Sequence, residues 1–171
     1  MGACGYTVPM LATIRRLAVL GLKISAALAF LAPLLTRLVM GVCFHVDGHG
    51  KIQHLDKVTG FFTSLGIPFP GANAAFISWL EFIGGFCLAI GLGTRIFAGL
   101  LACTMFVALL TSDGGTLIQK FHEDVSTITD VTSFTYLLFL IWLVLYGPGP
   151  ISIDYFLSKW LGLKGKSEES A

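Results

Sequence analysis

The sequence predicts an all-α integral membrane protein: a four-helix transmembrane bundle with an N-terminal amphipathic helix and short interfacial helices. The first observation is composition, since 55% of the 171 residues are hydrophobic and only 12% are charged. Soluble domains carry roughly a quarter charged residues. The mean hydropathy is correspondingly high, at +0.82. The second observation is a series of four apolar runs, separated by polar or Gly/Pro-rich stretches.

The N-terminal segment, residues 1–31, is predicted to be an amphipathic extension. Arg15, Arg16 and Lys23 interrupt an otherwise apolar run. At helical spacing these three cations fall on one broad side. We therefore expect a helix lying on the membrane surface. An additional membrane span is the alternative interpretation of the same residues.

The transmembrane domain is expected over residues 32–156. The first crossing has Pro33 in its first turn, where proline fits a helix, and ends in the Gly-rich run 47–51. Residues 52–71 predict a short interfacial helix followed by a Pro-rich turn, and residues 111–130 predict a polar loop. The four expected crossings cover residues 32–48, 74–92, 96–110 and 131–146.

The C-terminal part is expected to turn after the fourth crossing. The run 147–150, Gly-Pro-Gly-Pro, ends that crossing, and Ser152 is a good N-cap for a short amphipathic helix. Residues 157–171 form the predicted cytoplasmic tail. Both termini are predicted to be cytoplasmic, because most basic residues fall on the terminal side of a four-crossing topology. Those residues are Arg15, Arg16, Lys23, Arg95, Lys159, Lys164 and Lys166.

Glu81 is the most informative residue, because it lies inside the second apolar run. A charged side chain at that depth costs roughly 3 kcal/mol on insertion scales, so it must face the protein interior. Gly84 and Gly85 follow at i+3 and i+4, on the same helix face. Small residues there allow another helix to approach closely. We therefore expect Glu81 to point into a tightly packed bundle.

A polar and small stripe is expected on the first crossing, where residues recur at i+4. The stripe comprises Arg37, Gly41, His45 and His49. Counting turns places His45, His49, Glu81, Tyr136 and Asp113 in the outer half of the bundle, and Arg37, Arg95 and Asp154 in the inner half. His45 and Glu81 are candidates for a proton-exchanging pair; the alternative is a hydrogen bond that only joins two helices. Arg37, His49, Tyr136 and Arg95 are candidates for contact with a quinone or lipid.

Simpler roles remain open for several of these residues. Arg37 and Asp154 could form a structural ion pair, Arg95 could anchor the helix at the interface, and His49 and Lys51 could be solvated. A cation shared by His45 and His49 would need further ligands from Asp47 or His122, and no metal motif supplies them. We therefore assign no metal site. The cysteines have no paired spacing, which argues against a structural disulfide. The formal net charge of +1 gives no indication of nucleic-acid binding.

Several segments resemble the DoxX family. They are the run 35–51 (LTRLVMGVCFHVDGHGK), the turn 66–71 (GIPFPG), the runs 81–85 (EFIGG) and 91–95 (GLGTR), and the run 147–154 (GPGPISID). The resemblance implies a four-helix protein of the bacterial inner membrane. It also implies a link to thiosulfate:quinone oxidoreductases and to membrane redox complexes that handle thiols. The positions that match are Arg37, His45, His49, Lys51, Glu81 and Arg95.

Two functions follow from these observations. The first is an accessory subunit of a larger membrane complex, respiratory, photosynthetic or otherwise redox-active, with lipid or quinone contact. The extension at residues 1–31 and the acidic segment 113–130 favour it as added contact surfaces. The second is a quinone-interacting oxidoreductase subunit that uses the Glu81 and His45 pair. No CxxC or flavin motif is present, so a periplasmic or soluble redox partner would bring the electrons. A carrier or metal handler is a third class.

Overall fold

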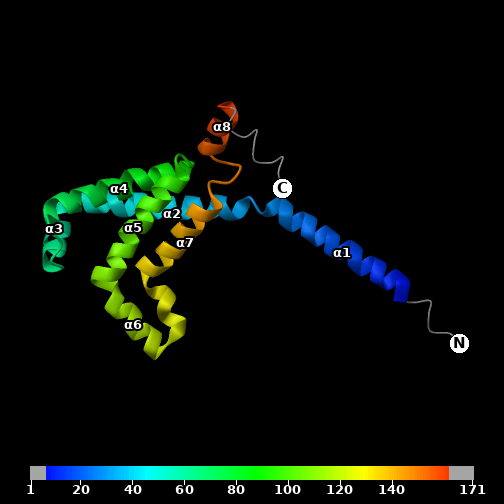
Figure 1. Ribbon diagram of the computed structural model, residues 1–171, viewed down its shortest axis with the longest axis horizontal. Helices are drawn as coiled ribbons and strands as arrows, with labels where there is room; N and C mark the ends of the chain where they lie inside the picture. Colours follow the sequence, from blue (N-terminus) through cyan, green and yellow to red (C-terminus); the bar gives the residue numbers. More distant parts are fainter. Residues whose placement is uncertain (1–6, 162–171) are drawn as a thin grey trace. The chain divides into compact units, whose positions relative to one another are not determined.

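The computed structural model describes residues 7–161, with side chains from residue 14 onward, and this part of the chain is helical and contains no strand (Figure 1). The predicted all-α class is therefore confirmed. The elements are α1 (Thr7–Leu28), α2 (Leu31–Gln53), α3 (Leu55–Ser64), α4 (Pro70–Ile90), α5 (Thr94–Ala108), the π-helical turn η1 (Leu109–Asp113), α6 (Gly114–Glu123), the 3-10 turn η2 (Val125–Asp130), α7 (Thr132–Tyr146) and α8 (Ile153–Trp160).

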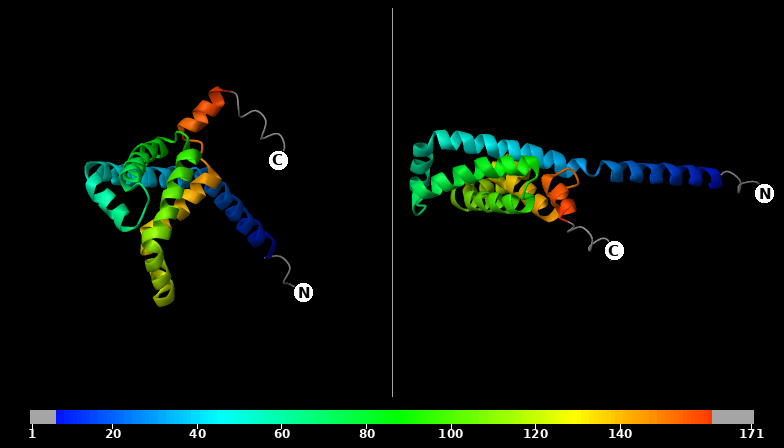
Figure 2. Two further views of the ribbon diagram at one scale, coloured as in Figure 1. Left: turned by 60° about the vertical axis from the view of Figure 1, so that its left-hand side comes forward. Right: turned by 90° about the horizontal axis from the view of Figure 1, so that it is seen from above.

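The chain divides into two units, Met1–Ala32 and Pro33–Ala171. In the described part of the first unit, the side chains of residues 14–29 on α1 and just after it are exposed. A helix with this exposure needs lipid or protein around it, because its composition is apolar. In the second unit, α2 and α4 run side by side, as do α5 and α7 (Figures 1 and 2). The short helix α3 joins α2 to α4.

Within the described residues, three helical stretches are long and apolar enough to cross a membrane: Ile14–Gln53, Pro70–Ile90 and Thr94–Glu123. The helix α7 is apolar but has 15 residues, about 22 Å at 1.5 Å per residue. That length is less than the ~30 Å of a typical hydrocarbon core. Membrane insertion of an all-helical protein is supported, whereas the four-crossing bundle stays a prediction.

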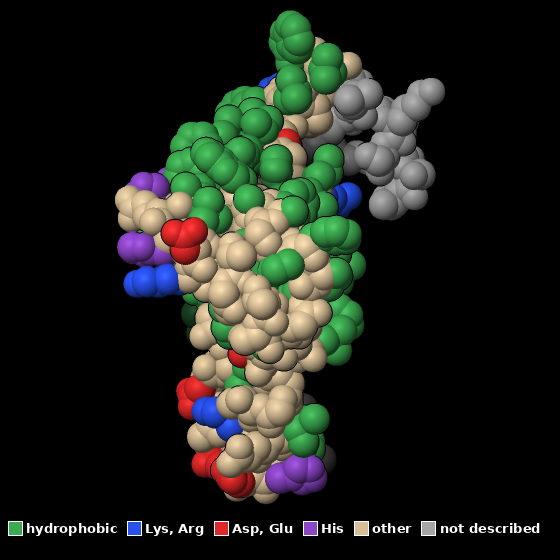
Figure 3. Space-filling model, turned by 90° about the vertical axis from the view of Figure 1, so that its left-hand side faces the viewer, with side chains coloured by type: hydrophobic (Ala, Val, Ile, Leu, Met, Phe, Trp, Pro, Cys, Tyr) green, Lys and Arg blue, Asp and Glu red, His purple; other side chains and the backbone are tan. Residues whose placement is uncertain are grey.

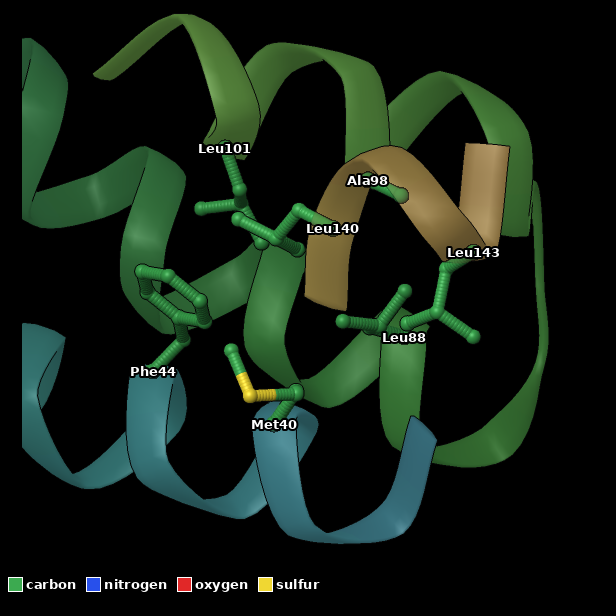
Figure 4. Packing of buried hydrophobic residues seen from close by; sticks show 7 residues of the cluster. All are labelled: Met40, Phe44, Leu88, Ala98, Leu101, Leu140 and Leu143. Carbon is green, nitrogen blue, oxygen red and sulfur yellow. The ribbon is translucent and has the colours of Figure 1, made fainter. Parts of the chain in front are cut away.

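The core of the second unit draws on four helices. Met40 and Phe44 come from α2, Leu88 from α4, and two further pairs from α5 and α7 meet them (Figure 4). The remaining members are Ala98, Leu101, Leu140 and Leu143, all with no exposed surface. In contrast, many large apolar side chains on the outer faces of these helices are exposed, which fits contact with lipid.

Glycines set the spacing between α2 and α4. A Cβ placed on Gly48 would lie 2.3 Å from the backbone nitrogen of Phe82. A Cβ on Gly85 would lie 2.4 Å from the backbone nitrogen of His45, and one on Gly41 would lie 2.7 Å from the Gly85 carbonyl oxygen. The backbones are therefore in direct contact, as small residues permit between membrane helices. This confirms the expected close approach of a helix near Gly85.

Two predicted boundaries were wrong. The helix α2 does not end near Gly48 but continues to Gln53, because Gly48 packs against α4 and Lys51 binds a residue of α4. The segment 111–130 is not a loop, since it forms η1, α6 and η2. Lys120 Nζ lies 3.1 Å from Asp130 Oδ2 and 3.3 Å from the Thr127 carbonyl oxygen, which ties α6 to η2. On the face drawn in Figure 3, charged side chains gather toward α6.

The connection into α8 follows the prediction. Ser152 is the N-cap of α8, and its hydroxyl oxygen accepts a hydrogen bond of 3.1 Å from the Tyr155 amide. The turn between α4 and α5 uses Gly91 and Gly93, both at positive φ, where a side chain would be strained. The backbone amide of Asp154 donates to the Gly91 carbonyl oxygen at 3.0 Å. The start of α8 is therefore held against this turn. The last ten residues of the predicted tail lie outside the described residues.

Candidate functional site

The buried carboxylate of Glu81 is paired with a lysine. Lys51 Nζ lies 2.6 Å from Glu81 Oε1 and 2.5 Å from Oε2. The Glu81 side chain is 1% exposed, whereas that of Lys51 is 37% exposed. Removing a carboxylate from water costs free energy, which a nearby opposite charge and hydrogen bonds can offset. The Lys51 ammonium provides both. The predicted burial of Glu81 is therefore confirmed.

This ion pair borders an apolar pocket of about 330 Å³. Phe61 and Phe62 of α3 lie on one side of it, and Met105 of α5 lies on another. The volume is at the lower end of the range for small-molecule sites, which are mostly apolar with a few polar groups that orient the ligand. The other lining residues are Lys51, Lys57, Val58, Leu65, Ile67, Ile77, Glu81, Thr104, Val107, Ala108, Thr111 and Ser112.

The hydroxyl groups of this pocket are already engaged by the backbone. Thr104 Oγ1 donates to the Leu101 carbonyl oxygen and Thr111 Oγ1 donates to the Val107 carbonyl oxygen, each at 2.8 Å. Lys51 has three N–H donors, of which the Glu81 oxygens take two. Lys51, Glu81 and Lys57 are therefore the ionisable groups that can bind or exchange a proton with a ligand in this pocket, and Lys51 and Glu81 are the two that are paired.

His45 and Glu81 do not form the hydrogen bond that was the alternative to a proton-exchanging pair, since each has another partner. His45 Nδ1 donates to the Phe82 carbonyl oxygen at 2.9 Å, and its ring stacks on the Phe82 ring with centroids 4.3 Å apart. The exposed His49 also lies near Phe82, at 6.0 Å between ring centroids. Residues 81 and 82 point about 100° apart around a helix, so a side chain that packs on Phe82 lies away from the Glu81 carboxylate.

The expected ion pair between Arg37 and Asp154 was also wrong, although both residues lie at the same end of the bundle. Arg37 Nη1 and Nη2 donate to the carbonyl oxygens of Pro148 and Ile151, both at 2.6 Å. The Asp154 carboxylate instead accepts from the amides of Gly93 at 2.7 Å and Thr94 at 2.8 Å. Both side chains therefore hold the connection into α8.

The other two predicted ligand-binding residues lie in different places. Tyr136 of α7 packs edge-on against Phe44, with ring centroids 5.3 Å apart. Arg95 is exposed at the start of α5, in a second groove beside α8. Neither residue lines the Lys51–Glu81 pocket. On α5 the nearest lining residues of the two cavities are Ile96 and Thr104, so the cavities lie about 12 Å apart along the helix axis at 1.5 Å per residue.

Metal ligands do not gather in residues 7–161, where no three His, Cys, Asp or Glu side chains are placed to hold an ion. Of the cysteines that the structure describes, Cys43, Cys87 and Cys103 are free thiols. Cys4 lies outside the described residues.

The family model described as DoxX matches residues 32–114. This segment belongs to the DoxX family. The DoxX segment runs from α2 to the start of α6, and it contains every residue that lines the Lys51–Glu81 pocket. The groove beside α8 depends on residues 146–158, which lie beyond the DoxX match.

Two curated relatives carry the comparison further. The chain is 38% identical to "Putative oxidoreductase CatD" of Bacillus subtilis (strain 168) over 78 residues, which are 46% of this chain and 57% of that protein. The chain therefore spans little more than half the length of CatD. It is 29% identical to "Inner membrane protein YqjF" of Escherichia coli (strain K12) over 127 residues, 74% of this chain and 92% of that protein. No solved structure matches the chain.

The DoxX site contains one residue whose role the sequence reasoning missed. Lys51 was named among the positions that match the family, with solvation at a helix end as its simpler role, but its pairing with Glu81 was not predicted. A spacing of three and four residues would have identified it, because Arg37, Gly41, Phe44, Gly48 and Lys51 fall on one helix face. Residues at strict i+4 spacing are each rotated by about 40° around the helix relative to the one before. His45 and His49 therefore lie progressively away from the face that contains Arg37.

Proposed function

We propose that this DoxX-family membrane protein is a redox subunit that binds a quinone head group in the Lys51–Glu81 pocket. The observation that carries the proposal is the Lys51–Glu81 ion pair, whose carboxylate is buried. The pair lies at the wall of an apolar cavity in the membrane-embedded part of the chain. Ionisable groups in such a place are costly and are usually kept for a function. Lys51 and Glu81 replace the His45 and Glu81 pair as the proposed proton-exchanging groups.

The side chains of the pocket fit a quinone. The Lys51 ammonium can donate its remaining N–H to a carbonyl oxygen, and Phe61 and Phe62 offer aromatic surface to a planar ring. A bound quinone would accept two electrons and two protons to give a quinol. Lys51 Nζ would give a proton to a ligand oxygen and regain one at its exposed side, while the buried Glu81 carboxylate holds the ammonium in place.

The electrons must come from a partner that contains a reductant. The sequence has no CxxC and no flavin motif, so a periplasmic or soluble redox protein is the proposed donor. The printed name "Putative oxidoreductase CatD" supports redox chemistry, and the printed name "Inner membrane protein YqjF" supports a location in a bacterial inner membrane. Cytoplasmic termini, which follow from the positive-inside rule, complete the proposal.

An accessory role in a larger membrane complex is the second candidate. The observation that favours it is the ordered segment after α5. Here α6 and η2 carry the Lys120–Asp130 ion pair, and Asp124 caps η2 by accepting from the Ser126 amide at 2.9 Å. An ordered polar element outside the apolar helices is a ready surface for a neighbouring subunit. In this case the pocket would hold a lipid or quinone without turnover.

Binding of a short-chain ubiquinone to the purified full-length protein tests the first candidate. We expect the Kd to rise about tenfold in Lys51→Met, through loss of one charged hydrogen bond. Ala108→Trp, which fills the pocket from the α5 side and keeps both charged residues, should abolish binding. His45→Ala is the matched control, because His45 packs on Phe82 and does not line the pocket. Equal affinity of wild type and Ala108→Trp would refute the assignment.

A further inference from the structure

A second cavity lies at the opposite end of α5 from the Lys51–Glu81 pocket. It is a groove of about 690 Å³ between the start of α5, the end of α7 and one face of α8. Arg95 and Ile96 form its α5 side, Tyr146 its α7 side, and Asp154 and Ser158 its α8 side. The function proposed above does not use this groove.

The groove contains a cation for which the described residues supply no counter-charge. Arg95 is exposed, and its guanidinium makes no hydrogen bond or ion pair with any residue in the range 7–161. The nearest carboxylate in the groove, that of Asp154, has both oxygens engaged by the amides of Gly93 and Thr94. The five N–H donors of Arg95 are therefore available to an external anion, and their planar fork suits phosphate oxygens.

The surroundings of the groove are those of a membrane interface. On α8, apolar side chains repeat at i, i+3, i+4 and i+7, and all of them are exposed: Ile153 42%, Phe156 66%, Leu157 44% and Trp160 83%. The polar residues Asp154 and Ser158 lie on the other face, toward the groove. A short amphipathic helix of this kind lies in the plane between head groups and acyl chains. Tyr146 stacks on Trp142 with ring centroids 5.2 Å apart, as aromatic pairs do at interfaces.

The groove is held in shape by hydrogen bonds that leave Arg95 free. Asp154 bridges α8 to the first turn of α5, and Arg37 binds the carbonyl oxygens of Pro148 and Ile151 behind it. Gly147, at a φ of 91°, lets the Arg95 side chain lie against the backbone, since a Cβ there would be 3.1 Å from Nη2. The absence of a side chain at Gly147 therefore leaves room for the Arg95 guanidinium beside the backbone.

We propose that this groove binds the phosphate of an anionic phospholipid, with Arg95 as the phosphate ligand. The acyl chains would lie along Ile96 and Tyr146, which line the groove and are 68% and 52% exposed. A free phosphate ion shares the head-group chemistry but would gain nothing from these apolar surfaces. The site therefore selects a lipid, and specifically one with a net negative head group.

Native mass spectrometry of the full-length protein in detergent, titrated with phosphatidylglycerol, tests this site. Loss of the charged hydrogen bonds in Arg95→Gln should weaken binding about tenfold. Ser158→Phe, which narrows the groove and keeps the cation, should weaken binding to a similar degree. Arg16→Gln is the charge-matched control on α1 and should bind like wild type, and an unchanged elution volume verifies that each variant is folded.

Two comparisons separate the lipid site from its alternatives. Phosphatidylcholine has a neutral head group and should bind more weakly than phosphatidylglycerol, whereas inorganic phosphate should not displace the bound lipid. Equal binding of both lipids, efficient displacement by phosphate, or an equal loss in Arg16→Gln and Arg95→Gln would each overturn the proposal. These outcomes are independent of quinone binding in the other pocket.

Discussion

Lys51 of α2 and Glu81 of α4 form an ion pair in which one ammonium contacts both carboxylate oxygens, at 2.6 and 2.5 Å. The carboxylate is sealed from solvent, while the lysine side chain keeps 37% of its surface exposed. The two helices touch backbone to backbone at Gly48, three residues before Lys51. The pair thus combines a helix contact with a polar group at the wall of a pocket.

Removal of Lys51 should destabilise the fold by leaving Glu81 buried and unpaired. For Lys51→Met we expect a loss of about 1–2 kcal/mol, less than for a fully buried pair because the lysine is partly solvated. This corresponds to a fall in apparent Tm of roughly 3–6 °C for a chain of this size. Thermal unfolding in detergent micelles provides the measurement.

The double variant distinguishes pairing from simple packing. In Lys51→Met/Glu81→Gln no charge is left unpaired, so part of the lost Tm should return, giving a non-additive cycle. A double variant whose Tm loss equals the sum of the two single losses would show that the ion pair contributes nothing to stability.

Two glycines on α2 should respond in opposite ways to the same substitution. Gly48→Ala places a Cβ 2.3 Å from the Phe82 backbone nitrogen, which forces the helices apart and should cost about 1–3 kcal/mol. Gly50→Ala meets nothing within 4 Å and should be neutral or stabilising by up to about 1 kcal/mol, because alanine favours the helix. Thermal unfolding of both variants measures the difference, and equal Tm values would contradict the α2–α4 contact.

The Asp154 carboxylate should stabilise the end of the bundle that carries α8. Asp154→Ala removes two hydrogen bonds to the amides of Gly93 and Thr94, and we expect a loss of about 2 kcal/mol. Asp154→Asn keeps one acceptor oxygen and should lose less. Limited proteolysis after Lys159 should speed up in the same order, and identical cleavage rates in all three proteins would rule out this anchoring role.

The cap of η2 should depend on pH. The backbone hydrogen bond from Ser126 lowers the pKa of Asp124 below its usual 3.8. The carboxylate cap is therefore complete above that usual value and is lost as the pH falls through the lower folded-state pKa. The Ser126 amide chemical shift, followed by NMR, should titrate with a midpoint below 3.8, and Asp124→Asn should abolish this transition. A midpoint above 3.8 would show that the hydrogen bond is not formed.

The helical class, the burial of Glu81 and the N-cap at Ser152 were predictable from the sequence. Each follows from a local rule: apolar run length, the cost of a charge in hydrocarbon, or the preference of serine for an N-cap. The end of α2 was not predictable in the same way. Gly48 and Gly50 weaken a helix by local propensity, but the contacts of Gly48 and Lys51 with α4 stabilise the helical form.

The partner of Glu81 required knowledge of helix phase. From Arg37, His49 is rotated by about 120° around the helix, whereas Lys51 is rotated by only about 40°. A stripe drawn at strict i+4 therefore led to the histidines, which pack on Phe82, and away from the lysine. Likewise, Arg37 and Asp154 each bind backbone groups instead of one another. Which backbone groups they reach depends on the shape of a turn, and residue spacing does not predict that shape.

Photoaffinity labelling with an azido-quinone tests the central claim, a quinone site at the Lys51–Glu81 pocket, most directly. The full-length protein in liposomes is irradiated with the probe, digested, and the modified peptides are sequenced. We expect label on α3 and on the C-terminal part of α5, with Ala108→Trp losing it. Label found only on other helices, or unchanged label in Ala108→Trp, would contradict the claim.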